Sequence, residues 1–121
     1  MGLDSYVFAD YKATKDIKGI IELSDDSTGI AYWRKTWFIH SYMAEYYQQN
    51  YDENEYDFNC IPTQVNQEML EVLLKVMTQE YLLDSLSGYS DIEEYDIEEL
   101  QKVISYSKSN PDTPLYFYSW Y

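Results

Sequence analysis

Both ends of the chain carry segments with the composition of β-strands, and this feature constrains the fold more than any other. Residues 5–11 are rich in aromatic and β-branched side chains, and residues 115–120 are mostly aromatic. A two-stranded ribbon is only marginally stable by itself in water. We therefore expect the two terminal strands to pair in one small sheet that packs against the helical remainder of the chain.

Two helices are expected in the first two thirds of the chain. Residues 32–50 carry aromatic or apolar side chains, together with His40, at every third or fourth position, which is the helical period. Residues 64–84 follow Thr63, which we expect to act as their N-cap. The apolar positions of this second segment cover more than half of the helix circumference, so we expect it to be the central core helix.

A third helix is expected close to the C-terminal strand. Asp96 and Glu99 have the spacing of a capping box and predict a helix over residues 96–109. A short strand is expected at residues 20–23. The sequence thus predicts an α+β fold, in which three helices pack on a small sheet that includes the N- and C-terminal strands, and one domain over residues 1–121.

The charge of the chain is strongly negative and unevenly distributed. The sequence has 22 acidic and 8 basic residues, which gives a formal net charge of −14. Residues 1–40 contribute −1 of this charge and residues 41–121 contribute −13. A field of this sign repels nucleic acid and anionic membranes, and it attracts basic proteins. We therefore expect a basic protein partner and no direct contact with nucleic acid or membrane.

Several classes of site are excluded by composition. With Cys60 and His40 as the single cysteine and histidine, the chain cannot form an internal disulfide, a cysteine zinc site or a multi-histidine metal site. The four glycines are not clustered, so there is no glycine-rich phosphate loop. No apolar run is long enough to span a membrane, and the first residues do not resemble a secretory signal. We expect no metal, no cofactor and a cytoplasmic location.

The acidic half of the chain interleaves carboxylates with tyrosines. Rows of carboxylates can imitate a phosphate backbone, and tyrosines supply rigid contact area at low entropic cost. The fifteen tyrosines are too many for one small core, so some are expected on the surface. The alternative is a solvated acidic face whose tyrosines serve the core. The predicted partner-binding residues are Glu45, Asp52, Glu53, Glu55, Tyr56, Asp57, Asp91, Glu93, Glu94, Tyr95, Asp96, Glu98 and Glu99.

A second candidate site consists of Asp4, Arg34, Lys35 and His40. If Arg34 and Lys35 open the first helix, they could bind a phosphate, and His40 with Asp4 could support acid–base chemistry. The structural alternative is that His40 packs among aromatic side chains on the helix. Cations at a helix N-terminus oppose the helix dipole, and we therefore expect an Asp4–Arg34 ion pair as their structural explanation.

Three groups of residues resemble a family of small phage and prophage proteins. They are residues 1–4 (Met-Gly-Leu-Asp), residues 32–35 (Tyr-Trp-Arg-Lys) with residues 39–40 (Ile-His), and residues 116–120 (Tyr-Phe-Tyr-Ser-Trp). The chain departs from the family at Ser5, where a long apolar side chain is usual, and at residues 36–38, where small or polar residues are usual. The resemblance implies a phage or mobile-element origin and no particular activity.

Charge and resemblance together predict a non-enzymatic phage protein of the anti-CRISPR or anti-restriction type. It would bind a basic nucleic-acid channel of a host defence nuclease, with a CRISPR effector as the first candidate, and block nucleic-acid binding. One alternative is a small enzyme or a nucleotide- or phosphate-binding module that uses Asp4, Arg34, Lys35 and His40. Another is an assembly factor that self-associates through its tyrosines. The sequence leaves open whether the protein is a monomer or a dimer.

Overall fold

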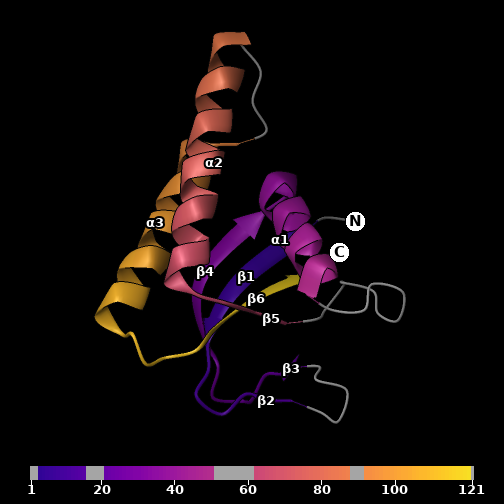
Figure 1. Ribbon diagram of the computed structural model, residues 1–121, viewed down its shortest axis with the longest axis vertical. Helices are drawn as coiled ribbons and strands as arrows, with labels where there is room; N and C mark the ends of the chain where they lie inside the picture. The colour runs from indigo at the N-terminus through magenta and orange to yellow at the C-terminus, as the bar shows by residue number, and fades with distance from the viewer. Residues whose placement is uncertain (1–2, 16–20, 51–61, 88–91, 121) are drawn as a thin grey trace.

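The structure is a computed structural model that describes residues 3–15, 21–50, 62–87 and 92–120. Within these residues the chain forms three helices, a four-stranded sheet and a two-stranded ribbon (Figure 1), so the α+β prediction is confirmed. In chain order the elements are β1 (Asp4–Ala9), β2 (Thr14–Lys15), β3 (Ile21–Glu22), β4 (Thr28–Arg34), α1 (Trp37–Asn50), β5 (Thr63–Val65), α2 (Gln67–Ser87), α3 (Glu94–Ser109) and β6 (Leu115–Trp120).

The two strands nearest the chain ends form the centre of the larger sheet. The strand order is β4-β1-β6-β5, and every neighbouring pair is antiparallel. Asp4 pairs with Trp120 and Ala9 pairs with Leu115, so β1 and β6 are aligned over their full lengths. The predicted pairing of the terminal strands is therefore confirmed. It makes the stability of the sheet depend on contacts between residues more than one hundred positions apart.

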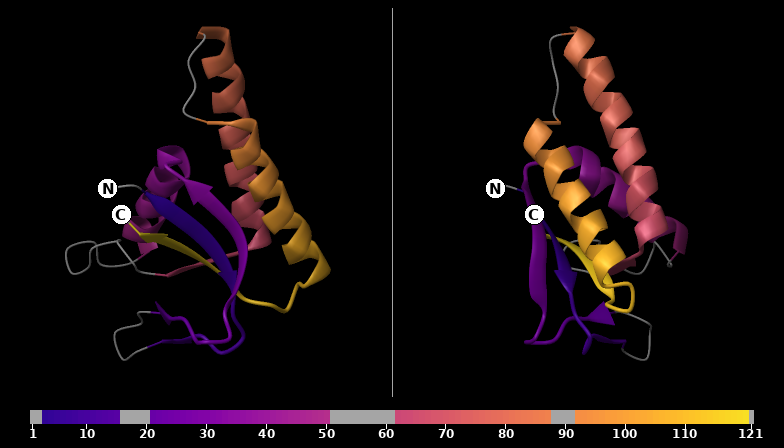
Figure 2. Two further views of the ribbon diagram at one scale, coloured as in Figure 1. Left: turned by 180° about the vertical axis from the view of Figure 1, so that it is seen from behind. Right: turned by 90° about the vertical axis from the view of Figure 1, so that its left-hand side faces the viewer.

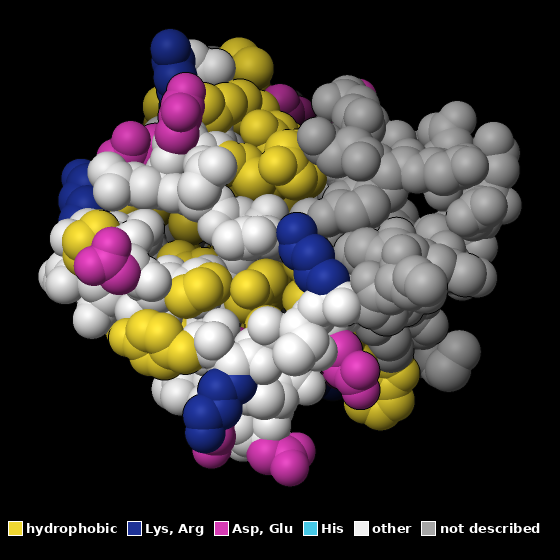
Figure 3. Space-filling model, turned by 60° about the horizontal axis from the view of Figure 1, so that its bottom comes forward, with side chains coloured by type: hydrophobic (Ala, Val, Ile, Leu, Met, Phe, Trp, Pro, Cys, Tyr) yellow, Lys and Arg dark blue, Asp and Glu magenta, His cyan; other side chains and the backbone are white. Residues whose placement is uncertain are grey.

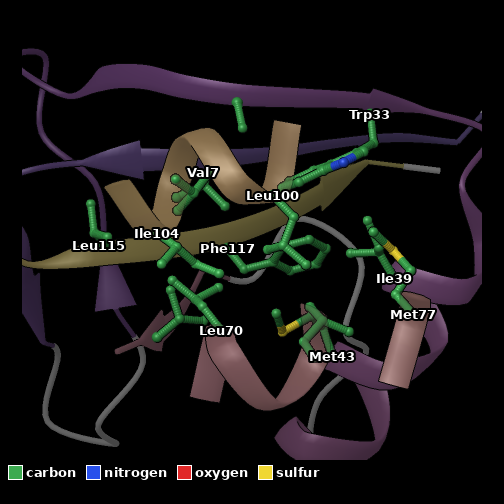
Figure 4. Close-up of a cluster of buried hydrophobic side chains, with 14 of the residues drawn as sticks. Val7, Trp33, Ile39, Met43, Leu70, Met77, Leu100, Ile104, Leu115 and Phe117 are labelled. Carbon is green, nitrogen blue, oxygen red and sulfur yellow. The ribbon is translucent and has the colours of Figure 1, made fainter. Parts of the chain in front are cut away.

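All three helices lie on one face of this sheet, as the right-hand view of Figure 2 shows. Alternate side chains of the strands point into this side, where Val7, Trp33 and Phe117 are at most 1% exposed. Figure 4 shows these three side chains facing Met43 of α1, Leu100 of α3 and others from the helices. Burial of this apolar surface is the main favourable contribution to folding.

The start predicted for the first helix, at residue 32, is wrong. The segment that ends at Arg34 is strand β4, in which Tyr32 and Arg34 are exposed and Trp33 between them is buried. This alternation is the period of a strand, and the four-residue spacing from Trp33 to Trp37 matched a helix only by coincidence. Lys35 then adopts a positive φ of 59°, and its N–H donates to the Leu3 carbonyl at 2.7 Å. The chain turns there, and α1 begins at Trp37.

The N-cap predicted for the second helix is also wrong. Thr63 lies in β5, where it pairs with Phe117, and it is fully buried. Asn66 caps α2 instead, because its Oδ1 accepts the Met69 N–H at 2.8 Å. A strand of three residues is too short to be recognised from alternation, so β5 was not expected.

Helix α2 packs between α1 and α3, but one side of it faces away from the core. Leu73 and Met77 are buried, but Val72, Val76 and Leu83 are 49%, 37% and 63% exposed. Figures 1 and 2 show that the C-terminal turns of α2 project beyond α1 and α3. The apolar positions from which a core helix was predicted therefore include side chains that are exposed on α2.

The third helix begins two residues earlier than predicted. Its first residue is Glu94 and its N-cap is Glu93, whose N–H donates to Asp96 Oδ2 at 2.9 Å. A capping box is present, but Asp96 is its third helical residue and not its cap. Two pairs of acidic residues have the three-residue spacing of a capping box, namely Glu93 with Asp96 and Asp96 with Glu99. Packing of the helix against β4 selects the first pair.

The small ribbon formed by β2 and β3 extends from the lower edge of the sheet (Figure 1). Asp10 holds it, because this buried carboxylate accepts the Ser24 N–H at 2.6 Å, the Ser24 hydroxyl at 2.7 Å and the Lys12 N–H at 2.9 Å. Burial alone raises the pKa of Asp10, but these hydrogen bonds outweigh it and lower the pKa. Figure 3 shows that cations and carboxylates are mixed on this end of the molecule, with hydrophobic side chains between them.

Candidate functional site

The first two turns of α3 carry the exposed part of the predicted acidic surface. Glu93, Glu94 and Glu98 are exposed, and Tyr95 between them is 48% exposed. None of the ion pairs in the described part of the chain engages these three carboxylates. We call Glu93, Glu94, Tyr95 and Glu98 the acidic turn. Its charges are available to a partner.

Asp96 is not part of this surface, which corrects its prediction as a partner-binding residue. Its side chain is 5% exposed, and its Oδ1 accepts the Thr36 hydroxyl at 3.0 Å. Its backbone carbonyl accepts the Trp33 indole N–H at 3.0 Å. Asp96 therefore joins α3 to the end of β4 and to the turn before α1.

Glu99 is also largely withdrawn from the surface. Its side chain is 12% exposed and pairs with Lys102 at 2.7 Å. Its carboxylate is also a hydrogen-bond partner of the Tyr95 hydroxyl, and this contact, with burial, raises the pKa of Tyr95. Because a cation already neutralises Glu99, we assign it little part in attracting a partner.

Glu45 lies on α1, at a groove between α1 and α2. The groove has a volume of about 440 Å³, and its walls include Trp37, Tyr42 and Glu80. Ile92 also lines it and directly precedes Glu93 in the chain. The groove and the acidic turn are therefore neighbours, although Glu45 and Glu93 are far apart in sequence.

Six predicted partner-binding residues lie outside the described residues. They are Asp52, Glu53, Glu55, Tyr56, Asp57 and Asp91. The acidic turn therefore does not include them.

The two cations of the alternative site lie next to the acidic turn. Arg34 and Lys35 are exposed and line a depression of about 480 Å³, and Glu93 and Tyr95 line it too. The depression thus contains a carboxylate beside the two cations, which weakens the case for a phosphate site there. Arg34 is at the end of a strand, so the expected conflict with the dipole of its own helix does not arise.

The predicted Asp4–Arg34 ion pair is absent from the described side chains. Asp4 and Arg34 are paired across β1 and β4, but Asp4 accepts the Tyr32 hydroxyl at 2.5 Å. This hydrogen bond is the main cause of the raised pKa of Tyr32. The N-terminal strand is therefore held by a tyrosine–carboxylate contact in place of a salt bridge.

His40 packs inside the molecule, as its structural alternative proposed. It is 8% exposed, its Nδ1 lies 3.1 Å from Ser119 Oγ, and that hydroxyl lies 3.0 Å from Ser5 Oγ. Burial lowers the pKa of His40. Since Ser5 and Asp4 point to opposite faces of β1, His40 and Asp4 do not converge on one pocket.

An aromatic surface that was not identified from the sequence covers the other face of the large sheet. Tyr6 lies at its centre, where it stacks on Phe8 with 5.5 Å between ring centroids and makes tilted ring contacts with Tyr32 at 5.1 Å and Tyr118 at 6.4 Å. Trp120 on the same face is 59% exposed. No described helix covers this face in Figure 2. We call these five residues the aromatic face.

The aromatic face and the acidic turn meet at the β4 edge of the sheet. The Tyr95 hydroxyl lies 3.4 Å from the Tyr32 carbonyl oxygen, and Tyr32 belongs to the aromatic face. The signal for this face was present in the alternating aromatics of both terminal segments. It could not be recognised without knowing which two strands are neighbours.

The described residues contain no group of three or more histidine, cysteine or acidic side chains arranged to hold a metal ion. Among the described helices, none combines the length and the apolar character needed to cross a membrane. Comparison with family models, curated proteins and solved structures finds no match for this chain.

Proposed function

We propose that the protein is a non-enzymatic inhibitor that binds a basic, nucleic-acid-binding protein and blocks its nucleic-acid channel. On the resemblance to phage proteins, the target would be a host defence nuclease in the bacterial cytoplasm, with a CRISPR effector as the first candidate and a restriction enzyme as the second. The observation that carries the proposal is the acidic turn, whose exposed carboxylates take part in none of the described ion pairs and lie beside exposed aromatic side chains.

This arrangement has the anatomy of a protein interface. Aromatic side chains are enriched at the centre of interfaces, and charged side chains belong to the rim. Here the aromatic face supplies the apolar contact area, and Glu93, Glu94 and Glu98 border it through Tyr95. A basic channel would be attracted by the net charge of −14 before any contact forms.

The geometry gives less support to the small enzyme or phosphate-binding module. His40 and Asp4 are separated by the sheet, and Arg34 and Lys35 line their depression together with Glu93. The assembly factor keeps support from the aromatic face, but self-association would bring together two chains of charge −14.

The test combines partner capture with a competition assay. Tagged protein captures its partner from bacterial lysate at about 0.1 M and 0.5 M salt, between which the Debye length falls to less than half. The purified partner is then loaded with labelled DNA or guide RNA and titrated with the protein. We expect a salt-sensitive nuclease that releases its nucleic acid.

A charge variant tests whether the acidic turn contacts the partner protein. Glu93→Gln, Glu94→Gln and Glu98→Gln together should weaken binding about tenfold, mainly through a slower on-rate. The matched control removes three exposed carboxylates elsewhere, through Glu22→Gln, Asp25→Asn and Asp112→Asn. Equal weakening by both variants would show that only net charge matters, and retention of nucleic acid by the captured partner would contradict the proposal.

A further inference from the structure

The groove between α1 and α2 has an unusual combination of walls. Trp37 and Tyr42 of α1 provide aromatic surface, and Val76 of α2 provides aliphatic surface. Glu45 of α1 and Glu80 of α2 also line the groove. The described side chains that line the groove include these two carboxylates and no lysine or arginine. We call it the aromatic–acidic groove.

Trp37 is held in place although half of its surface is exposed. Its indole is 51% exposed and makes an edge contact with the His40 ring, at 5.5 Å between centroids and 89° between planes. His40 in turn is fixed by Ser119 at 3.1 Å. The core thus orients an exposed indole, so a ligand that stacks on Trp37 does not have to order it first.

The chemistry of the walls discriminates between occupants. A purely apolar side chain would cover Trp37 and Val76 but would leave Glu45 and Glu80 desolvated without partners, which is costly. A lysine ammonium would neutralise one carboxylate as a compact and strongly hydrated charge. A guanidinium is planar, stacks on aromatic rings and donates to carboxylates, and it is less strongly hydrated than an ammonium.

A second copy of this chain is a poor occupant on electrostatic grounds. The protein carries a net charge of −14, and the groove itself carries two carboxylates. Self-association would therefore place like charges opposite one another. Charge complementarity favours a basic partner protein.

We propose that the aromatic–acidic groove receives an arginine side chain of the basic partner, with the guanidinium stacked on Trp37 and paired with Glu45 and Glu80. This inference rests on the proposed function, since it assumes a basic protein partner. The bound arginine would be a specific anchor next to the acidic turn. Trp37 and Glu80 would be partner-binding residues, which the charge distribution of the sequence alone does not indicate. The groove volume of about 440 Å³ is sufficient for one such side chain.

The test uses a small probe, so that it does not depend on the identity of the partner. N-acetyl-arginine methylamide is titrated into ¹⁵N-labelled protein, and the indole N–H signals of the tryptophans are followed by NMR. Trp37→Phe assigns the Trp37 signal. Trp33, which is buried, and Trp120, which is exposed on the aromatic face, serve as internal references. We expect a saturable shift of Trp37 and much smaller shifts of the other two signals.

Two comparisons make the result decisive. The citrulline analogue has nearly the same shape without the charge and should produce no saturable shift, and the lysine analogue should bind more weakly than arginine. Glu45→Gln with Glu80→Gln should weaken arginine binding about fivefold, whereas Glu98→Gln should leave it unchanged. Equal shifts of Trp37 and Trp120, or equal binding of citrulline, would overturn the inference.

Failure of this inference is distinguishable from failure of the proposed function. If the arginine probe does not bind but the acidic-turn variant still loses its partner, the groove is not an anchor and the inhibitor proposal stands. If the probe binds but no nuclease is captured, the groove recognises arginine in another kind of basic protein.

Discussion

His40 is a residue whose chemistry suggested a catalytic site and whose surroundings give it a structural role. Its ring lies between the exposed Trp37 and the buried Ser119, at 8% exposure. Burial disfavours the charged imidazolium, which is why its pKa is lowered. The same residue that packs the core therefore makes the folded state sensitive to pH.

The pH dependence of stability should show this effect with a definite sign. Because the pKa of His40 is lower in the folded protein than its ordinary value of 6.5, the unfolded chain takes up the proton first as the pH falls. Stability is thus retained above pH 6.5 and is lost below it, by at most about 1.4 kcal/mol per pH unit from this group.

Urea denaturation at pH values on both sides of 6.5 measures the effect. The His40→Gln variant is the control, because it keeps a polar side chain and removes the titration. We expect the wild-type protein to lose more stability than the variant as the pH falls through this range. Parallel profiles for the two proteins would show that carboxylates alone account for the pH dependence.

At the scale of the elements, the contacts between β4, α1 and α3 determine the position of the acidic turn. Asp96 accepts the Glu93 N–H at 2.9 Å and the Thr36 hydroxyl at 3.0 Å, and its carbonyl accepts the Trp33 indole N–H. These contacts set where α3 begins and bring Tyr95 against β4. The position of the exposed carboxylates thus depends on a carboxylate that is itself buried.

Replacing Asp96 with alanine should destabilise the protein and should not act as loss of one surface charge. The variant loses a helix-capping contact and leaves the Thr36 hydroxyl without its buried acceptor, so we expect a loss of about 2–3 kcal/mol in the free energy of unfolding. Urea denaturation measures it, with Glu98→Ala as the exposed control, for which we expect a change within about 0.5 kcal/mol. Similar stabilities for the two variants would contradict the role of Asp96 as a buried link.

At the scale of the whole molecule, the net charge of −14 affects folding and binding in opposite directions. Repulsion among carboxylates disfavours the compact state, and attraction to a basic partner favours the complex. Salt screens both. The described ion pairs engage three of the cations and leave most of the carboxylates unneutralised.

Thermal unfolding should therefore shift upward with salt while partner binding weakens. Between about 0.02 M and 0.3 M sodium chloride we expect stabilisation of about 1 kcal/mol, which for a chain of this size is about 4 °C in Tm. The Glu22→Gln, Asp25→Asn, Asp112→Asn variant should show a smaller shift, because it carries three fewer negative charges. A Tm that falls with salt would indicate that attractive ion pairs outweigh the repulsion.

By itself, the sequence determined the α+β class, the two terminal strands, the approximate extents of α2 and α3 and the excess of negative charge. These properties are encoded in short windows through periodicity and propensity, or in composition, so they do not require knowledge of the fold. The same local information failed at residues 28–34 and at Thr63, because a strand is defined by its partner as much as by its own side chains.

Only the tertiary structure decided which charged and aromatic side chains form a surface. Asp96 and Glu98 are two residues apart in the same acidic helix, and the helix turn sends the first into the interior and the second to solvent. Tyr6 and Tyr118 become neighbours only because β1 pairs with β6, and Glu45 shares a groove with Glu80 only because α1 lies beside α2. The physical reason is that binding surfaces are built from long-range contacts, and these depend on how the elements pack.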